Sequence, residues 1–238
     1  MTDENLHLAL FDADRGTYNS AEHIKDWIDV DYTDYKVIEG ELPGDPEEAE
    51  FDGVIISGSS AAVYSEKDWV ENLKEYVDRS VQAEIPHLGI CFGHQTLATV
   101  LGGKVERAED MEIGYKHLRG ASNSVLLDRV QNEFVGFEAH QDKVRKLPVG
   151  ARLLARDSKY IEGFRWRHVF GSQFHPEMSL EAAEEIFENE DDPSNKAHAD
   201  DEIQELYEKS VSAKTVFGNF ERYVRNFEPR EARNWPEG

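Results

Sequence analysis

Short apolar runs alternate with helical patterns through the first hundred residues, and this rhythm constrains the fold more than any other feature of the chain. Apolar runs of three or four residues are typical of buried strands, whereas apolar residues spaced three and four apart are typical of helices. The alternation predicts a parallel sheet with helices on both faces. The expected strands are Leu8–Phe11, Tyr35–Ile38, Val54–Ile56 and His87–Ile90. The expected helices are Ala21–Ile28, a helix that begins at a capping box formed by Ser65 and Asp68, and Gly93–Leu101.

The pattern changes after residue 120, where short segments alternate between apolar and polar residues. Such alternation is typical of strands with one solvated face, so we expect antiparallel strands that extend or flank the parallel sheet. An acidic loop is expected at about 188–202 and a final helix at about 203–227. We therefore expect residues 1–238 to form a single α/β domain whose sheet is mostly parallel. The expected antiparallel strands are Ser124–Leu127, Ala151–Ala155, Tyr160–Trp166 and His168–Phe174.

The chain carries 49 acidic residues against 26 basic ones, which gives a formal charge of −23. A surface this acidic repels phosphate groups, so we expect neither a nucleic acid nor an anionic membrane as a partner. It also fits a protein kept soluble in concentrated salt, where counterions screen self-repulsion, and we expect stability to rise with salt. An aromatic content of 11% excludes global disorder.

The first residues of the chain lack the basic and apolar regions of a secretion signal. No apolar run approaches the roughly 18 residues that span a bilayer. A cytoplasmic location is therefore expected.

The single cysteine, Cys91, stands in Gly89-Ile-Cys91-Phe-Gly93, where an expected strand meets an expected helix. This is the arrangement of a nucleophile elbow, in which glycines permit the tight turn that presents the central side chain. The N-terminus of the following helix favours the thiolate, and the N–H of Phe92 could stabilise an oxyanion. From these residues alone, a catalytic nucleophile and a buried structural thiol remain open alternatives.

A thiol nucleophile needs an oriented base, and the sequence offers nine histidines. His175-Pro-Glu177 follows the expected strand His168–Phe174, and the proline stiffens the backbone so that the carboxylate stays near the imidazole. Alone this tripeptide is weak evidence, but together with the elbow it indicates a Cys-His-Glu site.

At these motifs the chain resembles the class I, or triad, glutamine amidotransferases. The segment 89–95 matches the family pattern G-x-C-x-G-x-Q, and the segment 173–177 matches Q-F-H-P-E. The loop 57–64 resembles the S-G-G-P-x-S-V-Y of the amidotransferase part of GMP synthase, and 139–144 resembles its S-H-x-D-x-V. The matches follow the family order and cover about residues 5 to 180.

The resemblance implies a role for each matched residue. Cys91 would attack the side-chain amide of glutamine, His175 would carry protons and release ammonia, and Glu177 would orient His175. The N–H of Phe92 and one from Gly58 or Ser59 would form the oxyanion hole. Gln95 and the backbone around Ala139 and His140 would hold the substrate. The family implies no cofactor and no catalytic metal.

Two departures from the family pattern bear on the substrate. Ser59-Ser60 stands where Gly-Pro is usual, and Ala139 replaces a serine. The Ser-Gly-Ser loop, followed by Asp68-Trp69, also resembles the γ-glutamyl peptidases of this superfamily.

The sequence lacks the Ser-Gly-Gly-x-Asp-Ser loop of an ATP-pyrophosphatase, so ammonia would pass to a separate synthase subunit. The alternatives are a hydrolase acting alone on γ-glutamyl compounds and an idle binding module, which the intact triad disfavours.

Two other patterns have simpler interpretations. Asp12-x-Asp14 resembles the nucleophile motif of haloacid-dehalogenase-type phosphatases, but Gly16 stands where a threonine or valine is needed. A metal site at His87 and His94 lacks further ligands at sensible spacing. We expect a polar loop in the first case and local packing in the second.

Overall fold

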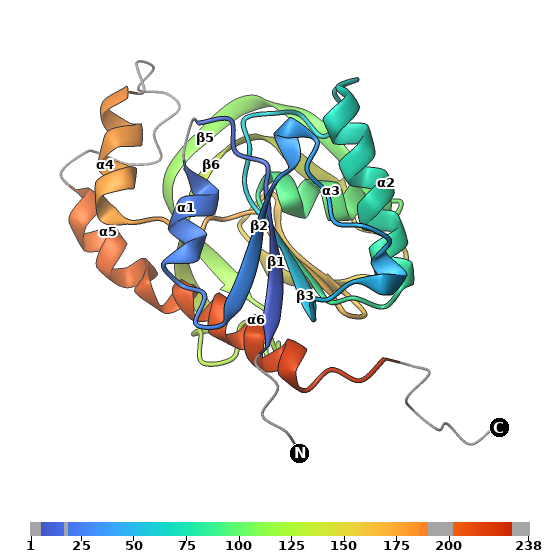
Figure 1. The fold of residues 1–238 in the computed structure, drawn as a ribbon. Coiled ribbons are helices and arrows are strands. Elements are labelled where there is room, and N and C mark those ends of the chain that lie inside the picture. The colour runs from blue at the N-terminus through green and yellow to red at the C-terminus, as the bar shows by residue number, and fades with distance from the viewer. Residues whose placement is uncertain (1–5, 17–18, 190–201, 230–238) are drawn as a thin grey trace.

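The structure is a computed structural model that describes residues 6–16, 19–189 and 202–229 (Figure 1). The described residues form a nine-stranded sheet of order β2-β1-β3-β4-β9-β8-β7-β5-β6. The pairs from β2 to β9 are parallel, and those from β9 to β6 are antiparallel. This confirms the expected α/β fold with an antiparallel extension. The strands are β1 (His7–Asp12), β2 (Asp31–Lys36), β3 (Gly53–Ile56), β4 (His87–Ile90), β5 (Lys104–Gly120), β6 (Glu133–Lys146), β7 (Arg152–Arg156), β8 (Ile161–Trp166) and β9 (Val169–Ser172).

Helices cover both faces of the parallel part, because its strands turn apolar side chains alternately to each side. On β1, Leu8 and Leu10 belong to the core that includes residues of α1 and α6, whereas Ala9 and Phe11 belong to the core under α2 and α3. Figure 1 shows α6 crossing one face of the sheet. The helices are α1 (Ser20–Lys25), α2 (Asp68–Gln82), α3 (Phe92–Val100), α4 (Leu180–Asn189), α5 (Ile203–Ser210) and α6 (Thr215–Arg225), with 3-10 turns η1 (Val37–Glu39), η2 (Pro46–Glu48) and η5 (Val211–Lys214).

The second strand lies earlier in the chain than the sequence predicts. The expected strand Tyr35–Ile38 ends at Lys36 in the structure, and its apolar end forms η1. The reason is that β2 is an edge strand whose first residues are exposed, so a polar sequence suffices there. The buried Val37 belongs to η1 and packs into the core from that turn.

The longest strands, β5 and β6, were not predicted. They pair along most of their length with a register shift between Arg107 and Glu112. Charged residues interrupt their apolar pattern, which hides them from a search for alternation. The strand expected at Ser124–Leu127 is wrong: this segment is a turn between β5 and β6, where Leu126 and Leu127 are buried in the core that includes residues of α6.

The carboxyl-terminal third differs from expectation in three places. Glu188 and Asn189, placed in the acidic loop, belong to α4, and residues 190–201 of that loop lie outside the described residues. The final helix is two helices joined by η5. The capping box is also wrong, since Lys67 is the N-cap of α2 and the Ser65 hydroxyl has no hydrogen-bond partner in the described part of the chain.

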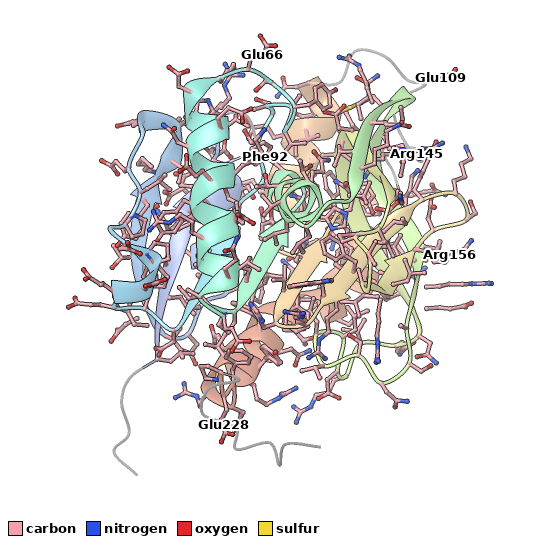
Figure 2. The ribbon with its side chains drawn as sticks, turned by 90° about the vertical axis from the view of Figure 1, so that its right-hand side faces the viewer. Glu66, Phe92, Glu109, Arg145, Arg156 and Glu228 are labelled. Carbon is pink, nitrogen blue, oxygen red and sulfur yellow. The ribbon has the colours of Figure 1, made fainter. Side chains whose placement is uncertain are left out.

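Charged side chains surround the sheet, and Figure 2 shows Glu66, Glu109 and Glu228 at the periphery while Phe92 lies in the interior. Within the described ranges, no helix is long and apolar enough to cross a bilayer.

Candidate active site

Cys91 lies between β4 and α3, at the turn that the sequence predicts to be an elbow. Its backbone has φ 48° and ψ −99°, a conformation that residues other than glycine rarely adopt. Glycine is required at positions 89 and 93, because neighbouring backbone atoms lie too close to leave room for a β-carbon. A β-carbon on Gly89 would lie 2.3 Å from the carbonyl carbon of Gly93, and one on Gly93 would lie 2.4 Å from the oxygen of Ile56. The turn holds the thiol at the carboxyl ends of the parallel strands, where α/β proteins bind ligands.

His175 reaches the same edge because β9 is the parallel neighbour of β4, with Ile90 opposite Ser172. The N–H of Cys91 donates to the carbonyl of Ser172 over 2.7 Å, which ties the elbow to β9. The N–H of His175 donates to the carbonyl of Phe137 on β6 over 2.8 Å. Sheet pairing thus joins two motifs that are distant in sequence.

The His175 ring lies in a buried, charged environment. Its Nδ1 donates to Oε1 of Glu177 over 2.7 Å, and both side chains are buried. Burial opposes a charge on the imidazole, but attraction to Glu177 and Cys91 outweighs it and raises the pKa of His175 well above its ordinary value. Burial opposes the charge on Glu177 too, yet contacts with His175 and Ser20 lower the pKa of this carboxyl. The arrangement places the imidazole between a carboxylate and a sulfur, where it can take up and release a proton.

Ser20 is a site residue that the sequence analysis missed. Its buried hydroxyl donates to Oε1 of Glu177 over 2.7 Å and accepts the N–H of Gly58 over 3.0 Å. It therefore links the Glu177 carboxylate to the loop after β3. No local signal marks this role, because a serine at the start of α1 resembles an ordinary helix-capping residue.

This link bears on the predicted oxyanion hole. The N–H of Gly58 is already donated to Ser20, so Ser59 is the remaining candidate from this loop. Phe92 is the first residue of α3, and its N–H therefore has no acceptor within the helix. The oxyanion roles of Ser59 and Phe92 stay predictions.

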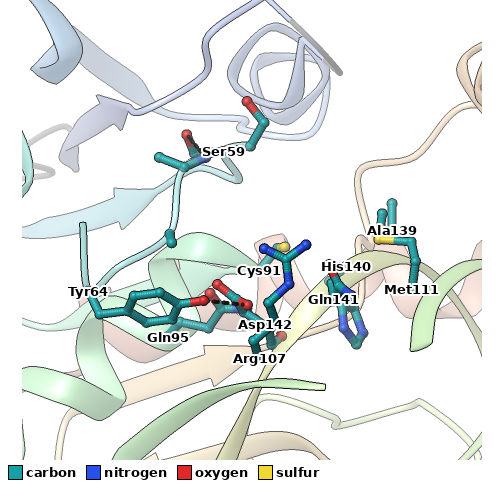
Figure 3. A pocket seen from close by; sticks show the side chains of 13 residues that line it. Ser59, Tyr64, Cys91, Gln95, Arg107, Met111, Ala139, His140, Gln141 and Asp142 are labelled. Carbon is teal, nitrogen blue, oxygen red and sulfur yellow. Dashed lines mark hydrogen bonds between the residues drawn. The ribbon is translucent and has the colours of Figure 1, made fainter. Parts of the chain in front are cut away.

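A cavity of about 250 Å³ opens at Cys91 (Figure 3). Figure 3 shows Ser59 and Tyr64 on one side of Cys91 and Ala139 with Met111 on the other. Tyr64 donates its hydroxyl proton to Asp142 over 2.9 Å across the mouth. Of the residues predicted to bind substrate or oxyanion, the cavity wall contains Ser59, Gln95, Ala139 and His140.

The side chain of Gln95 connects the cavity wall to the sulfur. Its amide nitrogen lies 2.8 Å from the carbonyl oxygen of Asp142 and 3.2 Å from Oε1 of Gln173. Gln173 in turn points its own amide nitrogen at Sγ of Cys91, 3.5 Å away. Gln95 therefore holds both the cavity wall and the side chain of Gln173 in place. The sequence analysis gave Gln173 no role in the site.

The simpler interpretations of the other patterns agree with the contacts. Asp12 pairs with Lys36, and Asp14 accepts the backbone N–H of Ser20 over 2.6 Å. The ring of His87 bonds to Ser80 and the Ile85 carbonyl, whereas that of His94 packs on Phe164 with a centroid distance of 5.1 Å. These side chains thus serve local structure.

An α/β sheet with a cysteine on an elbow beside a histidine–glutamate pair is the architecture of enzymes that form a thioester with their substrate. The model of the family described as glutamine amidotransferase class-I matches residues 21–191. The chain belongs to this family.

The curated relatives are of two kinds. γ-Glutamyl peptidase 5 of Arabidopsis thaliana is 33% identical over 162 residues, which cover 65% of this chain and 64% of the relative. One subunit of the glutamine-hydrolysing GMP synthase of Methanocaldococcus jannaschii is 34% identical over 144 residues, 59% of this chain and 72% of that protein. The similarity to the two kinds is thus nearly equal.

Solved structures support the fold. A glutamine amidotransferase of Thermotoga maritima superposes with a TM-score of 0.70 at 23% identity and covers 93% of this chain and 99% of its own. One from Methylobacillus flagellatus has a TM-score of 0.75 at 19% identity, over 92% of this chain and 94% of its own.

Proposed function

We propose that this protein hydrolyses the side-chain amide of glutamine to glutamate and ammonia, with Cys91 as nucleophile, His175 as proton carrier and Glu177 as its orienting partner. The observation that carries this proposal is the elbow at Cys91, whose sulfur shares one site with the buried His175–Glu177 pair. A merely structural cysteine would need neither the strained backbone nor the neighbouring imidazole–carboxylate pair.

The reaction follows from the positions of these groups. The sulfur of Cys91 attacks the amide carbon and forms a tetrahedral intermediate, whose oxyanion accepts hydrogen bonds from backbone N–H groups. His175 gives its proton to the amide nitrogen, the C–N bond breaks, and ammonia leaves a γ-glutamyl thioester. His175 then takes a proton from water as that water attacks the thioester, and the sulfur leaves as glutamate forms.

The charges of the cavity suit the amino-acid end of the substrate. Among the described residues that line it, Arg107 is the one lysine or arginine, and Asp142 is the one acid. A glutamine zwitterion presents one carboxylate and one ammonium group, which these two side chains complement. We therefore assign Arg107 to the α-carboxylate and Asp142 to the α-ammonium group.

We propose further that the ammonia is delivered to a separate synthase subunit that binds ATP. This rests on the relative from Methanocaldococcus jannaschii, whose name makes it one subunit of a glutamine-hydrolysing GMP synthase. The segment Ala61-Ala-Val63-Tyr64, which resembles the loop of that enzyme, supplies residues to the cavity wall.

A second candidate is a γ-glutamyl peptidase acting alone. The similarity to the Arabidopsis peptidase favours it, as does Ser59-Ser60 in the loop beside Cys91. A peptidase would cleave the same γ-glutamyl carbonyl but release an amine larger than ammonia.

Assays of the purified chain on glutamine and on γ-glutamyl dipeptides, followed by glutamate release, separate these functions. We expect slow glutamine hydrolysis that increases when the ATP-pyrophosphatase subunit of a GMP synthase and its nucleotide substrates are added. Cys91→Ala run in parallel measures any contaminating glutaminase. Fast cleavage of dipeptides without a partner, with glutamine a poor substrate, would establish the peptidase instead.

Ser20→Ala tests the link between Glu177 and the Gly58 loop. Loss of a hydrogen bond to a buried charge costs about 1.5–3 kcal/mol, so we expect kcat to fall about 10-fold or more while Ser20→Thr, which keeps the hydroxyl, retains activity. Steady-state kinetics on glutamine measure this.

Ser80→Ala is the matched control, because it removes another buried hydroxyl, which bonds to His87 away from the site. It should lower the melting temperature without a comparable loss of kcat. Equal losses of kcat in Ser20→Ala and Ser80→Ala would show that only general stability is affected.

A further inference from the structure

Two strands bring three potential metal ligands together behind the wall of the catalytic cavity. Glu138 and His140 lie on β6, and Glu162 lies on β8. All three are buried, and their nearest oxygen and nitrogen atoms lie within 4.8 Å of one another. The hydrolysis proposed above gives no role to these three side chains, although His140 also lines the cavity.

The separations of these atoms suit a small cation. Nε2 of His140 lies 2.7 Å from Oε2 of Glu138 and 3.9 Å from Oε2 of Glu162. Ligands about 2.1 Å from a tetrahedral Zn²⁺ lie about 3.4 Å apart, a separation between these two distances. The two separations differ from this spacing by about 0.7 and 0.5 Å, and all three atoms lie within 4.8 Å of one another, so side-chain movements of that order would place them around one ion.

The cluster also contains polar atoms that lack partners. Within the described residues, Oε1 of Glu138, Oε2 of Glu162 and Nδ1 of His140 are buried and make no hydrogen bond. An unsatisfied buried polar group costs about 1–3 kcal/mol, so a concentration of them points to a missing ion or water. The Glu162 oxygen is directed into the cluster, where a cation would satisfy it.

The two neighbouring lysines do not supply that cation. Lys116 and Lys143 both pair with Glu112, the next acidic side chain along the sheet.

We propose that Glu138, His140 and Glu162 bind one divalent transition-metal ion, with Zn²⁺ as the best fit. An imidazole with two carboxylates suits Zn²⁺, Co²⁺ or Fe²⁺ better than Mg²⁺ or Ca²⁺, which prefer oxygen ligands alone. The ion crosslinks β6 to β8, and a water molecule completes a tetrahedral site. Its role is to fix the β6 segment that supplies His140 and Asp142 to the cavity wall.

Co²⁺ and Zn²⁺ titrations of the full chain test the proposal. The protein carries Cys91→Ser, because the thiol and His175 could bind the same ions. We expect one equivalent of Co²⁺ to give the visible absorption of a four-coordinate site, and Zn²⁺ to displace it. Bound ion should also raise the melting temperature relative to protein in EDTA.

Glu162→Gln keeps the shape of the side chain but removes a ligand charge, so affinity should fall at least about 10-fold. Glu106→Gln makes the same charge change at a partly exposed position and should leave affinity unchanged. A chain that binds no stoichiometric Co²⁺, or binds it equally well after Glu162→Gln, overturns the proposal. If Glu162→Gln misfolds, His140→Gln serves as the second ligand variant. An unchanged affinity for Co²⁺ in His140→Gln would likewise overturn the proposal.

Discussion

Cys91→Ala is expected to abolish glutamine hydrolysis, lowering kcat by more than about 10⁴-fold, because no other group can form the thioester. The fold should persist. Alanine keeps the β-carbon of the strained elbow, and the sulfur receives only a long hydrogen bond of 3.5 Å from Gln173. Glutamate release measures the activity, and thermal unfolding measures the fold.

Ser172→Ala, next to the elbow on β9, provides the control for local disturbance. Its hydroxyl bonds to the carbonyl of Phe174 rather than to a triad side chain. It should retain most of the activity even if it unfolds at a lower temperature. Turnover by pure Cys91→Ala at a rate near that of the unmodified protein would refute the assignment of the nucleophile.

His175→Ala is expected to be nearly as damaging as Cys91→Ala, whereas Glu177→Gln should be milder by roughly 10- to 100-fold. The proton carrier cannot be replaced, but an orienting group can be replaced in part. A glutamine at position 177 can still accept a hydrogen bond while it loses the charge that holds the imidazolium. Initial rates at saturating glutamine measure the ranking.

The pH profile of Glu177→Gln provides a second readout. The carboxylate raises the pKa of His175, so its removal lowers that pKa. If the protonated imidazole is the active form, activity is lost as pH rises through this pKa. The alkaline limb of kcat should therefore move to lower pH in Glu177→Gln.

The ranking of the two variants has a clear contrary outcome. A larger loss of kcat in Glu177→Gln than in His175→Ala would mean that the proton carrier is misassigned.

The elements that the sequence by itself determined are those specified by local rules. The strands β1, β3 and β4 are buried on both faces, so most of their residues are apolar and stand out. The elbow is recognisable from the sequence because its two glycines flank Cys91 within five residues, and a β-carbon on Gly89 would meet Gly93 in the same turn. Cys91 and the motif around His175 could therefore be identified before any contact was known.

The tertiary structure alone decided which distant residues meet. The edge position of β2 and the pairing of β5 with β6 depend on neighbours that a local pattern does not contain. Ser20 reaches Glu177 across the fold, and Glu162 reaches His140 from another strand. Hydrogen bonds and electrostatic contacts act over a few ångströms in space whatever the separation along the chain, so these partners become visible only once the sheet is assembled.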